Sequence, residues 1–274
     1  MLININQIRT NGKNLFQVYI NNYLTYYAET PWFDVKLPLG IENSRVLKFM
    51  DNNGQLVYRT KYNILENTLE TAVPLKYLFT GEQRFMQMSI LNQYNQICGS
   101  IYNKVNGLID TKLCFSFNNE LFIGHDVCSG KIRTISVFKG DLQVAQVTKP
   151  LSVKNNLDSY CIHLLDDYAY IADVISFFVI YFDYLYYRNS GQIVKEKTSF
   201  QMEYTYSKSN KFYNKFWIKE HFGDEEHARY TQMIEQNYIE GKKEFNRILS
   251  ILKIVGLIVL GYVFILAFIL IKSN

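Results

Sequence analysis

Residues 251–271 form one continuous apolar stretch, ILKIVGLIVLGYVFILAFILI, with a single lysine and no acidic residue. An α-helix of this length crosses the hydrocarbon core of a bilayer, which is about 30 Å thick. A helix also satisfies its own backbone hydrogen bonds, as lipid requires. The sequence therefore predicts a C-terminal transmembrane helix over 251–272, with the preceding domain held on one side of a membrane.

The charges beside this segment predict its orientation. Lys242, Lys243, Arg247 and Lys253 precede or begin the span, whereas only Lys272 follows it. Basic residues favour the cytoplasmic side of a membrane. The start of the chain lacks the basic and apolar order of a secretory signal. We therefore expect a single-pass protein of the cell membrane, with a C-terminal anchor and a cytoplasmic N-terminal domain.

The first half of the chain alternates short strand-like runs with polar turns. The clearest unit is FMDNNGQLVY at 49–58, and similar turns occur at 21–22, 92–95, 118–119 and 139–141. Asn and Gly supply the positive φ angles that tight hairpin turns need. Turn signals every 8–12 residues are typical of a meandering sheet or barrel. This pattern predicts a mainly β domain.

Residues 166–187 form an apolar segment of a different kind. Asp166, Asp173, Ser176 and Asp183 would share one side of a helix, within about 100° of one another. A second membrane span is the alternative. Its apolar residues favour insertion by roughly 4 kcal/mol, but Asp173 and Asp183 together oppose it by roughly 5 kcal/mol. The sequence therefore favours a helix over 164–187, buried in a protein core.

Hairpins followed by one very apolar helix resemble the tubby-like superfamily, which includes tubby C-terminal domains, LURP-one-related proteins and phospholipid scramblases. The resemblance rests on the strand–turn–strand unit at 49–58 and on the run 137–187. In that run, a hairpin, a short basic strand and a Tyr-containing strand lead into an apolar helix with a late Asp183. The resemblance covers about 15–188. It implies a closed antiparallel barrel around a central helix, here assigned to residues 1–190, whose groups hydrogen-bond Asp173 and Asp183.

The resemblance also implies a binding site. Tubby-like domains bind phosphoinositide headgroups through basic residues on the barrel surface. The matching stretch of this chain contains Lys131, Arg133, Lys139, Lys149 and Lys154, which we interpret as an anion-binding face. A solvated strand face is the alternative for any one of them. The calcium-binding segment, Pro-rich arm and Cys-rich run of the scramblase branch are missing from this sequence, which disfavours lipid translocation.

Residues 191–222 form a basic connector rich in aromatic residues. Lys211, Lys215 and Lys219 recur every four residues, with aromatic residues one and two positions later. As a helix, this segment would resemble an interfacial helix on anionic lipid. The predicted membrane-interface residues are Lys211, Phe212, Lys215, Phe216, Trp217 and Lys219. Packing on the barrel, with the aromatic residues inward, is the alternative.

An amphipathic membrane-proximal helix is predicted over 223–250. Gly223 and the acidic residues after it are typical of a helix start. Apolar residues then follow a 4-3-4-3-4 spacing at Ile234, Tyr238, Gly241, Phe245, Ile248 and Leu252. Such a stripe suits a short coiled coil, so a homodimer through 230–252 is one possible assembly.

The sequence contains no recognisable catalytic or cofactor motif. No nucleotide-binding loop, nucleophile elbow or zincin motif occurs, and the only adjacent acid–base pair of note is His125–Asp126. The four cysteines lack metal-site spacing, and a net charge of +4 is low for a nucleic-acid-binding protein. We expect a non-enzymatic membrane protein without a cofactor or metal, whose barrel binds anionic lipid headgroups or a related ligand. The alternatives are a scaffold that recruits a protein partner or self-associates, and a lipid translocator.

Overall fold

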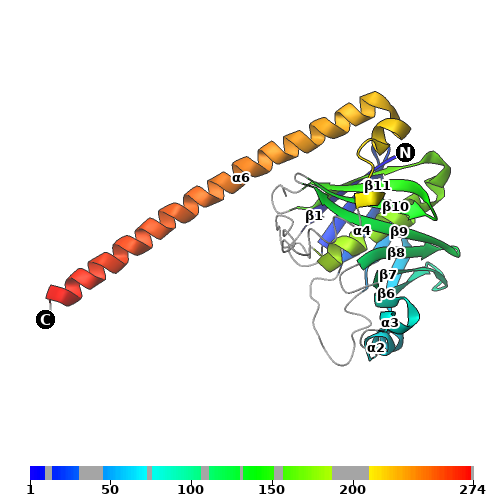
Figure 1. The fold of residues 1–274 in the computed structure, drawn as a ribbon, viewed down its shortest axis with the longest axis horizontal. Helices are drawn as coiled ribbons and strands as arrows, with labels where there is room; N and C mark the ends of the chain where they lie inside the picture. The colour runs from blue at the N-terminus through cyan, green and yellow to red at the C-terminus, as the bar shows by residue number, and fades with distance from the viewer. Residues whose placement is uncertain are drawn as a thin grey trace.

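The computed structural model of the chain describes residues 1–9, 14–30, 46–72, 76–105, 111–129, 132–150, 157–186 and 210–272. Its body is a closed antiparallel barrel in which each strand pairs with its neighbours in sequence, and β1 closes the ring against β12 (Figure 1). The strands are β1 (Leu2–Arg9), β2 (Asn14–Ile20), β3 (Tyr23–Thr30), β4 (Lys48–Asp51), β5 (Leu56–Tyr62), β6 (Gln83–Asn92), β7 (Ile97–Val105), β8 (Thr111–Phe117), β9 (Glu120–Ser129), β10 (Ile132–Lys139), β11 (Leu142–Pro150) and β12 (Ser159–Leu164).

Short turns join alternate pairs of strands at one end of the barrel, which we call the turn end. Asn21, Asn22, Asn118 and Asn119 have positive φ angles there, as does Gly140 between β10 and β11. These are the positions at which the sequence predicts hairpins, so turn chemistry located the strand pairs correctly. Pro150 is the last residue of β11 and pairs with Ile132 of β10.

A single apolar helix fills the barrel. The 3₁₀ helix η1 (Asp166–Ile171) leads into α4 (Ala172–Tyr186), whose Phe177 and Phe178 are at most 1% exposed. Phe115 of β8 lies 4.8 Å from Phe178, ring centre to ring centre. Asp166–Leu185 is long and apolar enough to cross a membrane, but 72% of it is buried inside the structure. The sequence-based choice of a core helix is therefore confirmed.

The two carboxylates on this helix receive hydrogen bonds from the barrel. The Tyr58 hydroxyl donates to Asp173 over 2.8 Å, and the Tyr160 hydroxyl donates to Asp183 over 2.5 Å. A buried carboxyl group without such partners would cost several kcal/mol. These bonds explain how an apolar core tolerates two acidic residues, as the sequence led us to expect.

An insertion between β5 and β6 escaped sequence analysis. It contains α2 (Ile64–Ala72) and the short α3 (Tyr77–Thr80), at the barrel end opposite the turns (Figure 1). The Asn67 amide fixes α2 to the barrel, because it donates to the Gln87 carbonyl oxygen and accepts from the Gln87 backbone N–H, each over 2.8 Å. A nine-residue helix with acidic residues and a weak start signal gave little to recognise.

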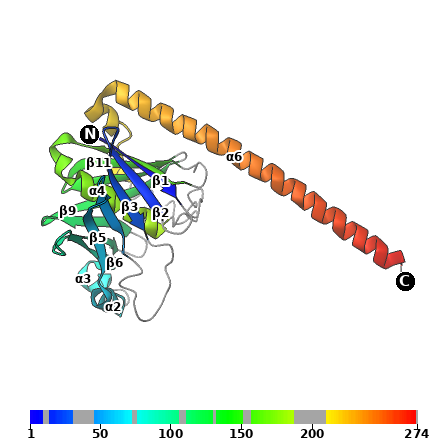
Figure 2. The same ribbon diagram turned by 180° about the vertical axis from the view of Figure 1, so that it is seen from behind.

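The helix α6 (Trp217–Lys272) follows the short 3₁₀ helix η2 (Asn210–Phe212). Its path changes at Gly223, where φ is 88°, next to the predicted helix start. Trp217, Ile218 and Tyr230 are buried against the barrel, together with the partly buried Leu165. Beyond this contact the helix projects away from the barrel (Figures 1 and 2). Its assignment as a stalk and membrane span remains a prediction.

Candidate functional site

The two ends of the barrel differ in charge. At the end opposite the turns, the outer three residues of the strands include eight basic residues and one acidic residue, Glu29, while Glu82 and Asp158 lie one residue before β6 and β12. The basic residues are Arg9, Lys48, Lys61, Arg84, Lys104, Lys112, Arg133 and Lys149. We call this the basic end. The turn end has five acidic residues, Asp51, Glu120, Asp141, Asp166 and Asp167; the basic groups near it are Lys139, the N-terminal ammonium, which contacts Asp166, and the lysines at 211, 215 and 219.

The first part of α6 runs along β11 from the turn end toward the basic end. Trp217 lines a cleft beside Leu142, at the start of β11. Further along the helix, after Gly223, the Tyr230 hydroxyl accepts hydrogen bonds from Gln146 and Thr148, each over 3.3 Å. The helix then continues in a direction that takes its C-terminus away from the N-terminus of the chain (Figure 2). Along β11, α6 therefore runs from the turn end in the direction of the basic end, and beyond this contact it projects sideways from the barrel.

Three lysines at the basic end are open to an external anion. Lys48 and Lys61 are exposed and Lys112 is half-buried, and none of the three forms an ion pair with a described residue. Arg84 and Lys104, by contrast, both contact Glu82. The insertion also brings Glu66 and Glu70 to this end, and Lys76 neutralises Glu70. Sequence analysis missed the three lysines because they lie on different hairpins.

The predicted anion-binding face is not assembled by the described residues. Lys131 and Lys154 lie outside them. Lys139 lies at the turn end, where it contacts Glu120 over 2.5 Å. Arg133 and Lys149 reach the basic end but point into the barrel, where their side chains are 11% and 3% exposed. The prediction that these five residues form one surface is therefore wrong for Lys139, Arg133 and Lys149.

Arg133 and Lys149 instead belong to a buried charge cluster. They are direct cross-strand partners, and each contacts a carboxylate, Asp126 for Arg133 and Asp158 for Lys149. The Arg133 guanidinium lies 5.3 Å from the centre of the Phe182 ring, on α4. Buried charges persist in proteins when they are paired in this way. The cluster therefore joins the basic end of the barrel to the last turns of the central helix.

Asp183 completes this cluster from α4. Complete burial raises the pKa of its carboxyl group to about 7, and the neighbouring Asp158 carboxylate adds to this effect. Lys149 and the hydrogen bond from Tyr160 act in the opposite direction. The Asp183 side chain therefore changes its charge near neutral pH, although it is 0% exposed.

The predicted interfacial segment adopts the alternative arrangement. Residues 211–219 do not form one helix, because η2 ends at Phe212 and α6 begins at Trp217. The Phe212 ring stacks on His125 at 3.6 Å, and Trp217 is 3% exposed. Lys211, Lys215, Phe216 and Lys219 are exposed, but they lie near the turn end, away from the side that α6 approaches. This packing also buries Tyr230, the first residue of the range 230–252 assigned to a homodimer, and partly buries Ile234, the first residue of the apolar stripe.

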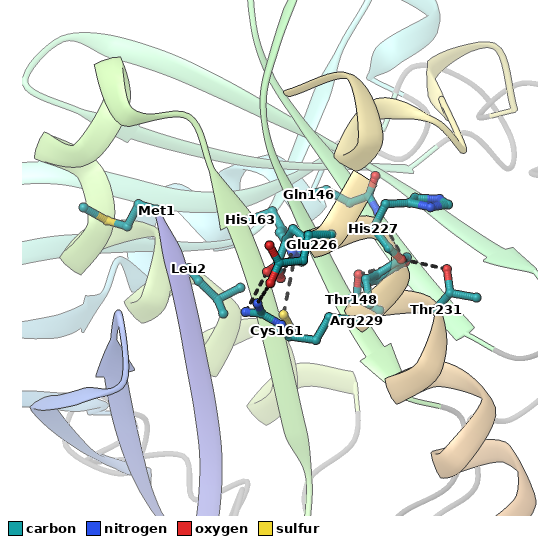
Figure 3. Close-up of polar contacts among 12 residues, drawn as sticks. Met1, Leu2, Gln146, Thr148, Cys161, His163, Glu226, His227, Arg229 and Thr231 are labelled. Carbon is teal, nitrogen blue, oxygen red and sulfur yellow. Dashed lines mark hydrogen bonds and ion pairs between the residues drawn. The ribbon is translucent and has the colours of Figure 1, made fainter. Parts of the chain in front are cut away.

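The contact between α6 and the barrel brings Cys161, His163 and Glu226 together (Figure 3). His163 Nε2 lies 3.1 Å from a Glu226 oxygen, and His163 Nδ1 lies 3.8 Å from the Cys161 sulfur. Arg229 holds the second Glu226 oxygen over 3.0 Å. This order resembles a nucleophile, base and acid, but burial raises the pKa of the Cys161 thiol to about 12. A protonated, buried thiol is a poor nucleophile, so the group acts as a packing contact.

The His125–Asp126 pair is divided between two faces of β9. Asp126 points into the barrel toward Arg133, whereas His125 lies outside under the Phe212 ring. Among the described residues, no group of three or more His, Cys, Asp or Glu side chains is arranged to hold a metal ion. Neither residue of the pair is therefore placed to assist the other in proton transfer.

Comparisons with protein-family models, curated proteins and solved structures find no match to this chain. The structure shows a mainly β protein with a closed antiparallel barrel around one apolar helix. That is the coarse architecture expected from the tubby-like resemblance, while the family itself remains a prediction.

Proposed function

We propose that this chain is a non-enzymatic, single-pass membrane protein whose cytoplasmic barrel presents its basic end to anionic lipid headgroups. The observation that carries the proposal is the path of α6, which begins beside the turn end and passes Gln146 and Thr148 of β11 in the direction of the basic end before it projects away from the barrel. A basic surface held near an anionic leaflet gains about 1 kcal/mol for each lysine close to it. The site residues of this proposal are Lys48, Lys61 and Lys112.

The start of the apolar segment supports the membrane part of the proposal. Ile254, Leu257 and Ile258 are 58%, 69% and 66% exposed, and no described element covers this part of the helix. A helix that is apolar on all sides and uncovered by protein suits a lipid environment. The stretch from Tyr230 to Ile251 is 21 residues, so the last barrel contact lies about 30 Å along the helix from the segment.

The test is co-flotation of residues 1–250 with liposomes. This fragment keeps the barrel and every described contact of α6 with it, while it lacks the apolar segment. We expect flotation with vesicles that contain phosphatidylserine, weak flotation with pure phosphatidylcholine, and loss of flotation at high salt. The variant K48E/K61E/K112E should lose most of this binding.

A matched control distinguishes the two candidate surfaces. The variant K211E/K215E/K219E makes the same change in charge near the turn end, on the residues that sequence analysis assigned to the interface. We expect it to float almost as well as the unmodified fragment. Equal loss of flotation in both variants would mean that binding depends only on net charge. Loss of flotation in the control alone would assign lipid binding to the connector at 191–222. Absence of flotation for the unmodified fragment would favour a membrane-anchored scaffold.

A further inference from the structure

A cleft of about 430 Å³ opens at the turn end of the barrel. One wall is the turn between β10 and β11, and the other consists of η2 and the start of α6. Aromatic and acidic side chains line the cleft, together with the basic Lys211 and with polar and apolar residues such as Gln143 and Leu142. The aromatic and acidic ones include Phe138, Asp141, Phe212, Tyr213, Trp217 and Glu220. A volume of this size is in the range of small-molecule sites, and it is too small for a folded partner.

The aromatic wall is fixed by contacts with the barrel. The Phe212 ring packs edge to face on Phe138, with ring centres 5.6 Å apart. The Phe212 ring also stacks on the His125 ring. The Lys211 ammonium lies 4.8 Å from the centre of the Phe212 ring. The protein thus already places a cation against this wall, at a distance typical of cation–π attraction.

The acidic groups of the cleft are suitably placed to attract a positive ligand. Glu220 accepts a hydrogen bond from Asn214 over 2.7 Å, which orients its carboxylate. Asp141, on the facing turn, makes no ion pair with a described residue. Lys211 also lines the cleft, so a cationic ligand would take the place of its ammonium beside the Phe212 ring.

We propose that this cleft binds a small organic ammonium compound, with aromatic rings against its alkyl groups and with Asp141 and Glu220 neutralising its charge. Alkylammonium groups are recognised in proteins by aromatic walls combined with carboxylates. The cleft lies at the end of the barrel from which α6 runs away, so the expected source is a dissolved molecule instead of a lipid headgroup. The inference goes beyond the proposed lipid contact; the choice of a dissolved ligand rests on that proposed function, whereas ammonium binding in the cleft does not.

The experiment is a titration of the full-length chain in lipid nanodiscs, with Trp217 fluorescence as the readout. Trp217 is one of two tryptophans, so a Trp32→Phe background leaves it as the only reporter. The probes are choline and tetramethylammonium, with the neutral isostere 3,3-dimethylbutan-1-ol as the ligand control. We expect saturable binding of both cations and none of the alcohol.

Two variants and one control locate the site. Asp141→Asn should weaken choline binding roughly fivefold, as expected for one charge at a solvent-facing site. Phe212→Leu keeps an apolar side chain but removes the ring, and it should weaken binding roughly 2- to 5-fold. Asp167→Asn makes the same charge change at an exposed position of the turn end that does not line the cleft, and it should leave binding unchanged.

The outcomes separate the proposal from its alternatives. Equal binding of the alcohol, no binding of either cation, or binding that neither Asp141→Asn nor Phe212→Leu weakens would overturn it. Nanodiscs of phosphatidylcholine and of phosphatidylglycerol distinguish the source of the ligand. Equal affinity for free choline in both supports a dissolved ligand, and competition by phosphatidylcholine would assign the cleft to a headgroup. Failure of liposome flotation would leave this result untouched.

Discussion

Replacing Asp183 with Asn tests the physical account of the barrel interior. In the folded protein its pKa is raised to about 7 from an ordinary value of 3.8. Between these two values the folded state binds more protons than the unfolded state, so stability falls as pH rises and the loss is complete above pH 7. At about 1.4 kcal/mol per pKa unit, the full loss is on the order of 4 kcal/mol.

The Asp183→Asn variant should escape this loss. Its amide stays neutral at every pH, and its oxygen can still accept the hydrogen bond from Tyr160. The stability difference between the variant and the natural sequence should therefore be small near pH 4 and grow by about 1.4 kcal/mol per pH unit up to pH 7. Contributions of titrating groups that do not contact Asp183 cancel in this difference, because both proteins contain them in the same surroundings.

The assay is urea unfolding of residues 1–250 at several values between pH 4.5 and 8.5, followed by circular dichroism. With a slope of about 2–3 kcal/mol per molar urea, the variant should unfold roughly 1–2 M later than the natural sequence at pH 8. A difference that does not change with pH, or a variant less stable at pH 8, would refute the reasoning. Either result would mean that Asp183 is ionised and well paired in the folded protein.

Two further predictions concern the barrel wall. Gly99→Ala should destabilise the protein by roughly 1–3 kcal/mol in thermal unfolding. A Cβ atom there would lie 2.1 Å from the Ser116 carbonyl oxygen, which is a backbone atom and cannot move aside. Unchanged stability would show that β7 and β8 can separate locally. Lys149→Met should lower the free energy of unfolding by roughly 3–5 kcal/mol at pH 8, since it leaves the Asp158 carboxylate buried without its cation. The double variant with Asp158→Asn should recover most of that stability. An equally unstable double variant would contradict the pairing.

Local chemistry explains why the hairpins were predictable from sequence. The Asn and Gly residues of the turns adopt positive φ whatever surrounds them, so their positions located the strand pairs at once. The polar stripe of the central helix was equally informative, because Asp173 and Asp183 ruled out an easy membrane span. The insertion with α2 and α3 had no comparable local signal, and tertiary contacts such as those of Asn67 hold it in place.

The direction of individual side chains was not predictable in the same way. Arg133 and Lys149 read as surface residues, but side chains on a strand alternate between two faces, and a shift of one residue exchanges them. Their placement depends on the register of β10 against β11, which pairs them directly and turns both inward. Strand β11 also hides its outer face under α6, so its pattern of burial does not alternate. In such a strand, the sequence pattern does not show whether a lysine points into the barrel or toward solvent.

The charge difference between the two ends of the barrel is present in the sequence, but a search for basic residues that are close together in sequence does not find it. In a barrel of consecutive antiparallel strands, every second connection lies at the same end. Lys48, Lys61 and Lys112 are far apart in sequence, yet each lies next to a connection of the same parity. Asp51 and Asp141 lie next to connections of the other parity. Grouping charges by the end at which their connection lies, instead of by nearness in sequence, separates the basic end from the turn end, and it assigns the two proposed sites to opposite ends of one barrel.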